Sequence, residues 1–205
     1  TGQSQIDVSF PKLEKFDVIP KPESSDASAF VSVMEGCNKY CSFCVVPKTR
    51  GHEVSRTVED ILNEVSSLVE KGAREIHFLG QNVNNFKGAY KGEKSSLAEL
   101  IELTGKINGV QRIRFTTSHP HEFKSNLVEA YSNVSELVSH VHLPVQSGSN
   151  RILKLMRRRY DVDKYLSLID DIRRVRPDMS FSSDFIVGFP GETREDFQAT
   201  LDLVE

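Results

Sequence analysis

The sequence predicts an α/β fold in which parallel β-strands alternate with α-helices. Short apolar runs rich in β-branched residues alternate with segments whose apolar residues have helical spacing. Five such strand–helix units follow one another from residue 29 onward. Either an open doubly wound sheet or a barrel satisfies this alternation, because periodicity does not distinguish them. In both architectures, functional side chains gather at the carboxyl ends of the strands.

The elements alternate in a regular order along the chain. Thr57 is the expected N-cap of the first helix and Gly72 its expected end. Pro177 ends the fourth helix, because proline lacks the N–H that a helix interior needs. The predicted strands cover residues 29–36, 75–81, 112–118, 140–146 and 180–189, and the predicted helices cover residues 57–72, 95–107, 125–133, 161–176 and 193–205.

Length and composition indicate one large domain with a packed core. The chain has 205 residues, of which 38% are hydrophobic and 27% charged. Residues 1–28 are polar and contain three prolines, so we expect a linker or N-terminal extension before a core domain over residues 29–205. No apolar run or basic leader indicates a membrane span or secretion, which favours a cytoplasmic protein. The chain begins with Thr1 and ends within a predicted helix at Glu205, so we expect a piece of a longer protein.

The charge balance excludes a basic field over the whole molecule. The net charge is −3 and the pI is about 6.1, so nucleic-acid binding has to rely on local patches. One such patch is the run Arg157–Arg159, which Arg151 and Lys154 precede. His119 and His121 lie at a predicted strand exit, where they either line an RNA site or satisfy local hydrogen bonds.

The three cysteines of the chain, Cys37, Cys41 and Cys44, form a CxxxCxxC motif after the first predicted strand. An odd number of cysteines this close together does not make a disulfide framework. Thiolates are soft ligands that suit an iron–sulfur cluster, and three of them leave one iron of a [4Fe-4S] cubane open for a small molecule. The alternatives are a zinc site completed by His52 and three inert buried thiols.

At this motif the sequence resembles the radical S-adenosylmethionine superfamily. The wider segment 34–56 is similar to its methylthiotransferase branch, and the segments 79–86, 142–160 and 184–193 agree with that branch. The resemblance implies a TIM-like (β/α)6 barrel with parallel strands, of which about five βα units are present. LGQNVN at 79–84 and FTTSHP at 115–120 are most similar to the tRNA-acting members of the branch.

The resemblance also implies an activity, a transferase reaction that adds a methylthio group to C2 of isopentenyladenosine next to the tRNA anticodon. S-adenosylmethionine chelates the open iron, and its reductive cleavage yields a 5′-deoxyadenosyl radical that abstracts hydrogen from C2. The implied partners are tRNA and a low-potential electron donor such as flavodoxin or ferredoxin, and we expect a monomer. The alternative substrates are a ribosomal protein aspartate and threonylcarbamoyladenosine in tRNA. An alternative of another class is a non-catalytic metal-bearing module that binds RNA.

The resemblance assigns cluster ligation to the three cysteines and names no catalytic residue beyond them. It places the Phe43 ring near the adenine of S-adenosylmethionine, although core packing is the alternative. Arg158 is expected near the carboxylate of the cofactor or facing RNA, and Asp184 near the ribose or in a structural role. Gln81 and Asn82 replace the more usual Gly-Glu pair. The full set of expected cofactor-binding residues is Phe43, Gln81, Asn82, Gln146, Ser147, Arg158, Asp184, Gly188 and Gly191.

The sequence also departs from the enzymes that it resembles. Those enzymes carry an N-terminal domain with three more cysteines, which hold an auxiliary [4Fe-4S] cluster, and a small C-terminal RNA-binding domain. Neither is present in these 205 residues. We therefore expect this chain by itself to bind one cluster and not to transfer a methylthio group.

Overall fold

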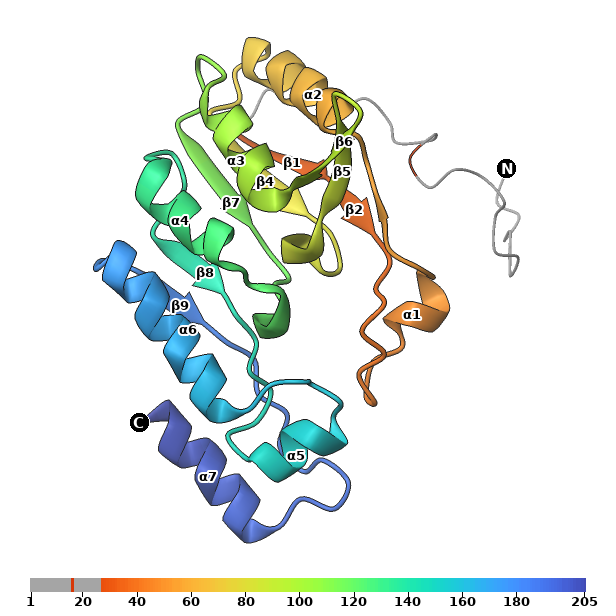
Figure 1. Cartoon of the computed structure of the whole chain (residues 1–205), viewed down its shortest axis with the longest axis vertical. Helices are drawn as coiled ribbons and strands as arrows, with labels where there is room; N and C mark the ends of the chain where they lie inside the picture. The colour runs from red at the N-terminus through yellow and green to blue at the C-terminus, as the bar shows by residue number, and fades with distance from the viewer. Residues whose placement is uncertain (1–15, 17–26) are drawn as a thin grey trace, which may run out of the picture.

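The computed structural model describes Phe16 and residues 27–205, and the predicted extension over residues 1–28 lies almost wholly outside them. Three parallel strands form the central sheet in the order β1-β4-β7 (Figure 1). They span Ser28–Ser32, Glu75–Leu79 and Arg112–Phe115. Ser28 pairs with Glu75, which pairs with Arg112, so the strands start level and their carboxyl ends lie at one edge.

A second parallel pair continues the same succession. β8 (His140–His142) pairs with β9 (Ser180–Ser182). A bridge between Ile113 and Leu137 links β7 to the segment that leads into β8. The strands therefore follow chain order, as in a barrel, and do not reverse as in a doubly wound sheet. Among residues 27–205 no pairing joins β9 to β1, so the expected barrel is an open one.

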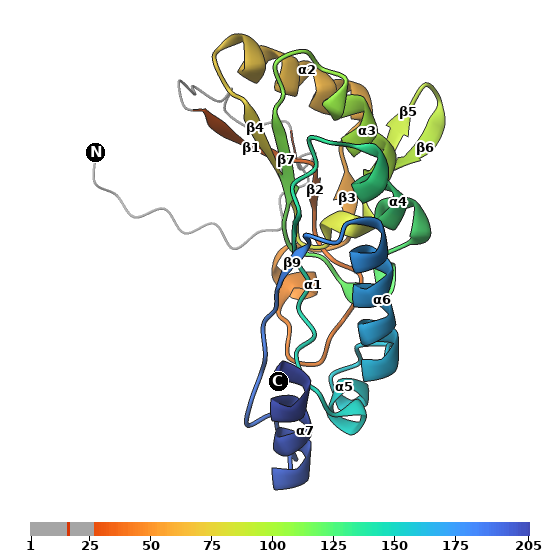
Figure 2. The same cartoon turned by 90° about the vertical axis from the view of Figure 1, so that its left-hand side faces the viewer.

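All five predicted helices are present. α2 (Val58–Glu70), α3 (Leu97–Gly105), α4 (Ser125–Asn133) and α6 (Val162–Val175) lie on the same side of the strands, and α7 (Arg194–Val204) follows β9 (Figure 2). The side chain of Thr57 accepts a hydrogen bond from the Asp60 amide and caps α2 as predicted. Thr193 begins α7 with a reciprocal capping box, which satisfies two backbone donors at once.

The sequence analysis did not predict several short elements. The apolar run at 29–36 divides into β1 and β2 (Met34–Glu35), and β2 pairs antiparallel with β3 (Val54–Ser55). β5 (Lys87–Tyr90) and β6 (Glu93–Ser96) form a hairpin before α3. Two short α-helices and two 3-10 helices complete the set: α1 (Val46–Thr49), α5 (Asn150–Leu155), η1 (Val83–Asn85) and η2 (Pro120–Glu122). These segments are too short for periodicity to reveal.

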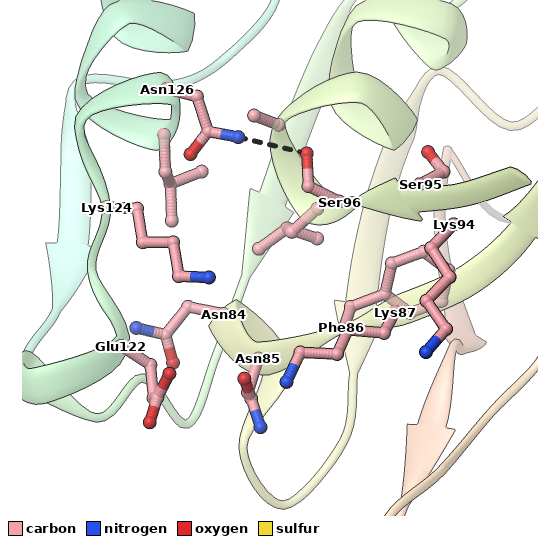
Figure 3. A pocket seen from close by; sticks show the side chains of 13 residues that line it. Asn84, Asn85, Phe86, Lys87, Lys94, Ser95, Ser96, Glu122, Lys124 and Asn126 are labelled. Atoms are coloured by element: carbon pink, nitrogen blue, oxygen red, sulfur yellow. Dashed lines mark hydrogen bonds between the residues drawn. The ribbon is translucent and has the colours of Figure 1, made fainter.

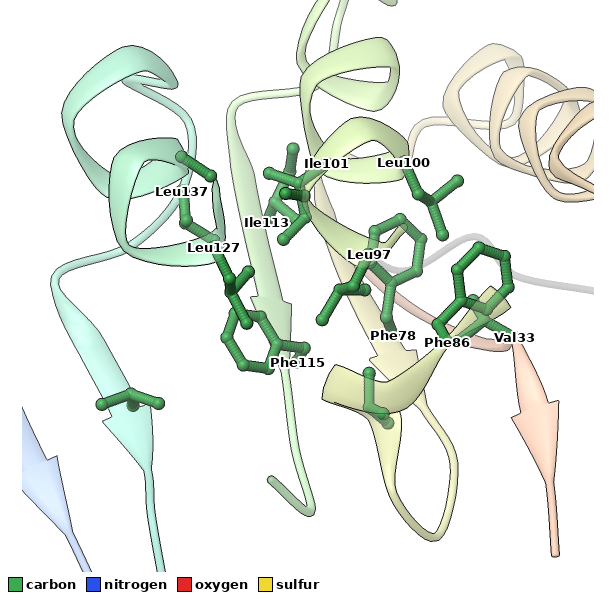
Figure 4. Packing of buried hydrophobic residues seen from close by; sticks show 14 of the residues in the cluster. Val33, Phe78, Phe86, Leu97, Leu100, Ile101, Ile113, Phe115, Leu127 and Leu137 are labelled. Atoms are coloured by element: carbon green, nitrogen blue, oxygen red, sulfur yellow. The ribbon is translucent and has the colours of Figure 1, made fainter. Parts of the chain in front are cut away.

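The hydrophobic core lies between the sheet and the helices. Phe78 and Ile113 from the strands pack with Leu97, Ile101 and Leu127 from α3 and α4 (Figure 4). All five side chains are at most 3% exposed. Burying each such side chain contributes about 1.5–3 kcal/mol. This packing fixes the strands and therefore the positions of the loops that leave their carboxyl ends.

No helix in the described part of the chain is long and apolar enough to cross a membrane.

Candidate metal and cofactor site

A cavity of about 330 Å³ opens at the carboxyl ends of the strands. Its volume lies within the range of small-molecule binding sites. Loops that follow all the parallel strands contribute to its wall, as the alternation of strands and helices predicted. The lining residues are Cys37, Lys39, Cys41, Phe43, Cys44, Val46, Gly80, Gln81, Asn82, Thr117, Ser118, His119, His142, Pro144, Gln146, Arg158 and Asp184.

All three cysteines line this cavity. Cys37 and Cys41 are buried and Cys44 is half-buried. The loop that carries them is fixed at its start, where the Gly36 amide donates to Gln81 Oε1 at 2.6 Å. Gly36 has a φ of +80°, and a Cβ at this position would collide with the carbonyl of His52. Only glycine tolerates both conditions, so the loop begins with the one residue that fits.

Glu53 ties the cysteine loop to the loop after β4. Its Oε1 accepts from Asn82 Nδ2 at 2.9 Å and from the Asn38 amide at 3.2 Å. Its Oε2 accepts from Asn85 Nδ2 at 2.6 Å. Asn82 and Asn85 are 1% and 8% exposed, so this carboxylate satisfies two buried amides and one loop backbone group. Sequence analysis did not single out Glu53, although it lies within the segment 34–56.

Arg158 lies under the cysteine loop and is 5% exposed. Its Nη2 donates to the Pro144 carbonyl at 2.8 Å, and its Nε donates to the Tyr160 hydroxyl at 2.9 Å. Its Nη1 lies 3.6 Å from Cys41 Sγ, within hydrogen-bond range for sulfur. The guanidinium is therefore held by three partners and places a fixed positive charge beside one thiol. It is not part of a surface patch, whereas its neighbours Arg157 and Arg159 are exposed.

The electrostatics around Cys37 favour a positively charged ligand. Burial raises the pKa of the Cys37 thiol, and the nearby Glu53, Cys41 and Cys44 raise it further. Several adjacent thiolates repel one another, and a bound metal compensates that repulsion by replacing their protons.

Three buried polar atoms of the cavity residues have no hydrogen-bond partner. They are Asn82 Oδ1, Ser118 Oγ and His119 Nε2. Burial and the positive charges of Arg158 and Lys39 lower the pKa of His119 to about 2, so its imidazole is neutral. Unsatisfied buried polar atoms are rare and indicate a missing ligand or water. The donor set thus fits a polar small molecule beside a thiolate-bound metal centre.

The arrangement does not favour the zinc alternative. His52 is outside the cavity lining, and its Nδ1 lies 3.1 Å from Asn38 Oδ1. Among residues 27–205, no group of three histidine, cysteine or acidic side chains is arranged to hold a metal ion. The zinc site completed by His52 therefore has no support in this geometry.

Most of the expected cofactor-binding residues come together here, namely Phe43, Gln81, Asn82, Gln146, Arg158 and Asp184. Ser147 does not. Its side chain is buried, its Oγ lies 3.3 Å from Thr200 Oγ1, and it accepts from the Ser149 amide. Gly188 and Gly191 also lie outside the cavity lining and are exposed. Their φ values of +71° and +82° fit a turn that requires glycine.

The side-chain oxygen of Gln81 accepts a hydrogen bond from the Gly36 backbone amide, so it positions the cysteine loop. The structure adds lining residues that sequence analysis did not name, among them Lys39, Ser118 and His142. His142 Nε2 lies 3.3 Å from Asp184 Oδ2, which joins the ends of β8 and β9. Lys39, Ser118 and His142 lie within segments that carry the resemblance, 34–56, 115–120 and 142–160, and that was the available signal.

Comparisons with known proteins agree with this geometry. The family model described as the radical SAM superfamily matches residues 31–204. A protein of Chromohalobacter salexigens named tRNA-2-methylthio-N(6)-dimethylallyladenosine synthase is 58% identical over 203 residues, and the alignment covers 98% of this chain and 45% of that protein. The protein of the same name from Pseudoalteromonas atlantica is 56% identical over 205 residues, covering 100% of this chain and 43% of its own length. The chain thus spans less than half the length of these relatives.

Solved structures show the same fold at low sequence identity. The radical S-adenosylmethionine methyltransferase TsrM from Kitasatospora setae, solved with cobalamin and a [4Fe-4S] cluster, gives a TM-score of 0.67 at 18% identity. That match covers 85% of this chain and 34% of TsrM. Coproporphyrinogen III oxidase (HemN) from Escherichia coli gives a TM-score of 0.59 at 16% identity, covering 90% of this chain and 43% of HemN.

Proposed function

Because the chain belongs to the radical SAM superfamily, we propose that Cys37, Cys41 and Cys44 hold a [4Fe-4S] cluster and that S-adenosylmethionine occupies the cavity beside it. The observation that carries this proposal is that one cavity is lined by three cysteines and by three residues whose buried polar atoms have no hydrogen-bond partner. When bound, the cluster supplies the electron that cleaves the sulfonium of S-adenosylmethionine. Flavodoxin or ferredoxin is the proposed source of that electron.

Different residues of the cavity bind different parts of S-adenosylmethionine or position the cysteine loop. Phe43 offers an aromatic face for the adenine, and Asn82 Oδ1 offers an acceptor for the methionine amino group. Gln146 and Asp184 lie at the ends of β8 and β9 and supply polar contacts for the ribose. Arg158 holds the cysteine loop and contributes positive charge for the methionine carboxylate. Cys37 and Cys41 are buried, which limits the access of water to the cluster.

We further propose that the complete protein adds a methylthio group to C2 of isopentenyladenosine in tRNA. Relatives with 55–59% identity over nearly the whole chain carry the name of that activity. The auxiliary cluster that supplies sulfur then belongs to the part of the protein beyond this chain.

A strain that lacks the gene tests this proposal. Nucleosides from its tRNA and peptides from its ribosomes are compared by mass spectrometry after the full-length gene is restored. We expect the methylthio-isopentenyladenosine to disappear in the deletion and to return with the parent gene. Cys41→Ala should fail to restore it, whereas Ser42→Ala on the same loop should succeed. Unchanged tRNA together with loss of a modified ribosomal aspartate would overturn the tRNA substrate.

A further inference from the structure

A second cavity has a volume of about 230 Å³, and its lining side chains are drawn in Figure 3. One wall comes from η1 and the β5–β6 hairpin, and the other from η2 and the start of α4. Leu97 and Ala98 at the start of α3 line it as well. None of the residues proposed to hold the cluster or the cofactor lines this second cavity.

Three lysines make the rim of this cavity positive. Lys87, Lys94 and Lys124 are exposed and line it. In the described part of the chain, none of the three takes part in an ion pair. Glu122 is the one carboxylate among the lining residues, and Lys39 neutralises it in an ion pair. The cavity therefore carries a net positive charge.

Two helix N-termini add to this charge. α3 and α4 have nine residues each, and the first turns of both line the cavity. α4 begins at Ser125, and its N-cap residue Lys124 makes no side-chain cap hydrogen bond. Asn126 Nδ2 donates to Ser96 Oγ at 3.1 Å and links the two helix starts (Figure 3). The uncapped start of α4, the two helix dipoles and the lysines together favour an anion such as phosphate.

The interior of the cavity is apolar, which a site for a free inorganic ion does not need. Phe86, Leu97 and Leu127 line the cavity beneath the lysines, and each is at most 3% exposed, so they form only a small apolar floor. An apolar floor with a cationic rim matches a nucleotide, whose base or sugar packs on the floor while its phosphate faces the lysines.

The two cavities share a wall. The Asn84 side chain bonds the backbone of His119 in both directions at 2.9 Å, and His119 lines the first cavity. The Lys39–Glu122 ion pair also spans the wall, because Lys39 lines the first cavity and Glu122 the second. The second cavity is therefore within reach of a nucleotide next to a base that lies at the mouth of the first.

We propose that this second cavity binds a nucleotide of the RNA strand next to the reactive base, with its phosphate on Lys87, Lys94 and Lys124. This inference rests on the proposed function and adds the place where the substrate backbone is held.

The test measures binding of a fluorescein-labelled RNA stem-loop, with isopentenyladenosine beside the anticodon, to the full-length protein by fluorescence anisotropy between 50 and 200 mM salt. The triple variant Lys87→Gln, Lys94→Gln, Lys124→Gln is compared with the parent. Lys106→Gln, an exposed lysine at the far end of α3, is the matched control. Each phosphate contact on a single strand contributes about −0.7 to the slope of log K against log salt.

We expect the triple variant to bind more weakly and its slope to be shallower by about 0.7, because one phosphate contact is lost. Over this fourfold change in salt, the parent should lose roughly 3-fold more affinity than the triple variant. Lys106→Gln should match the parent, and equal melting temperatures show that the exposed substitutions leave the fold intact. Equal affinity and slope for parent and triple variant would overturn the inference while leaving the proposed function standing. A parent that binds no RNA would overturn both.

Discussion

Substituting Glu53 should loosen the cysteine loop and destabilise the domain. In Glu53→Ala the buried side chains of Asn82 and Asn85 lose the acceptor that lies 2.9 and 2.6 Å away. A hydrogen bond to a charged group contributes about 1.5–3 kcal/mol, and contributions from one network are not additive. The two buried amides therefore predict a loss of about 3 kcal/mol in the free energy of unfolding. The hydrogen bond from the backbone N–H of Asn38, which tethers the cysteine loop to Glu53, is lost as well.

Urea unfolding of metal-free protein under anaerobic conditions measures this loss. We expect a lower transition midpoint with an unchanged m-value, because the fold stays the same. Glu70→Ala is the control, since Glu70 is exposed at the end of α2. Glu53→Gln should be intermediate, because its amide keeps one acceptor oxygen and turns a donor toward the other asparagine.

Iron content after anaerobic reconstitution gives a second reading of the same substitution. A loop that has lost its tether to Asn38 should hold less iron per chain than the parent loop. If the free energy of unfolding of Glu53→Ala stays within about 0.5 kcal/mol of the parent, and the iron content is also unchanged, the reasoning from these hydrogen bonds is refuted.

Three further substitutions test other parts of the structure. Gly36→Ala should destabilise the domain by at least about 2 kcal/mol more than Gly72→Ala, because only the former adds a collision with His52 to a positive φ; equal melting temperatures would contradict this. Hydrogen bonds, first from Arg112, lower the Glu75 pKa from 4.5 to about 2. This contribution to stability is complete above pH 4.5 and lost as pH falls toward 2, so Glu75→Gln should flatten the stability profile in that window. Arg158→Lys should cost about 2 kcal/mol, since an ammonium cannot reproduce the three-partner geometry; a parent-like melting temperature would argue against it.

The sequence by itself determined the five parallel strands, the five longer helices and the cysteine motif. Helix periodicity and caps are local properties, so Thr57 caps α2 as predicted, and α7 begins one residue after its predicted start at 193. The alternation of elements also predicted a parallel sheet and placed the cysteine loop at its carboxyl edge. These features depend on residues close together in the chain, where spacing alone carries the information.

Only the tertiary structure decided which side chains share the site. Gln81 turned out to bond Gly36 across 45 positions of the chain, and Glu53 to bond Asn82 across 29. The ladder of β8 ends at His142, so strand alternation no longer governs Ser147, which points into the protein. Contacts between distant residues, and side-chain directions in loops, depend on how the strands and helices pack, and periodicity carries no information about either.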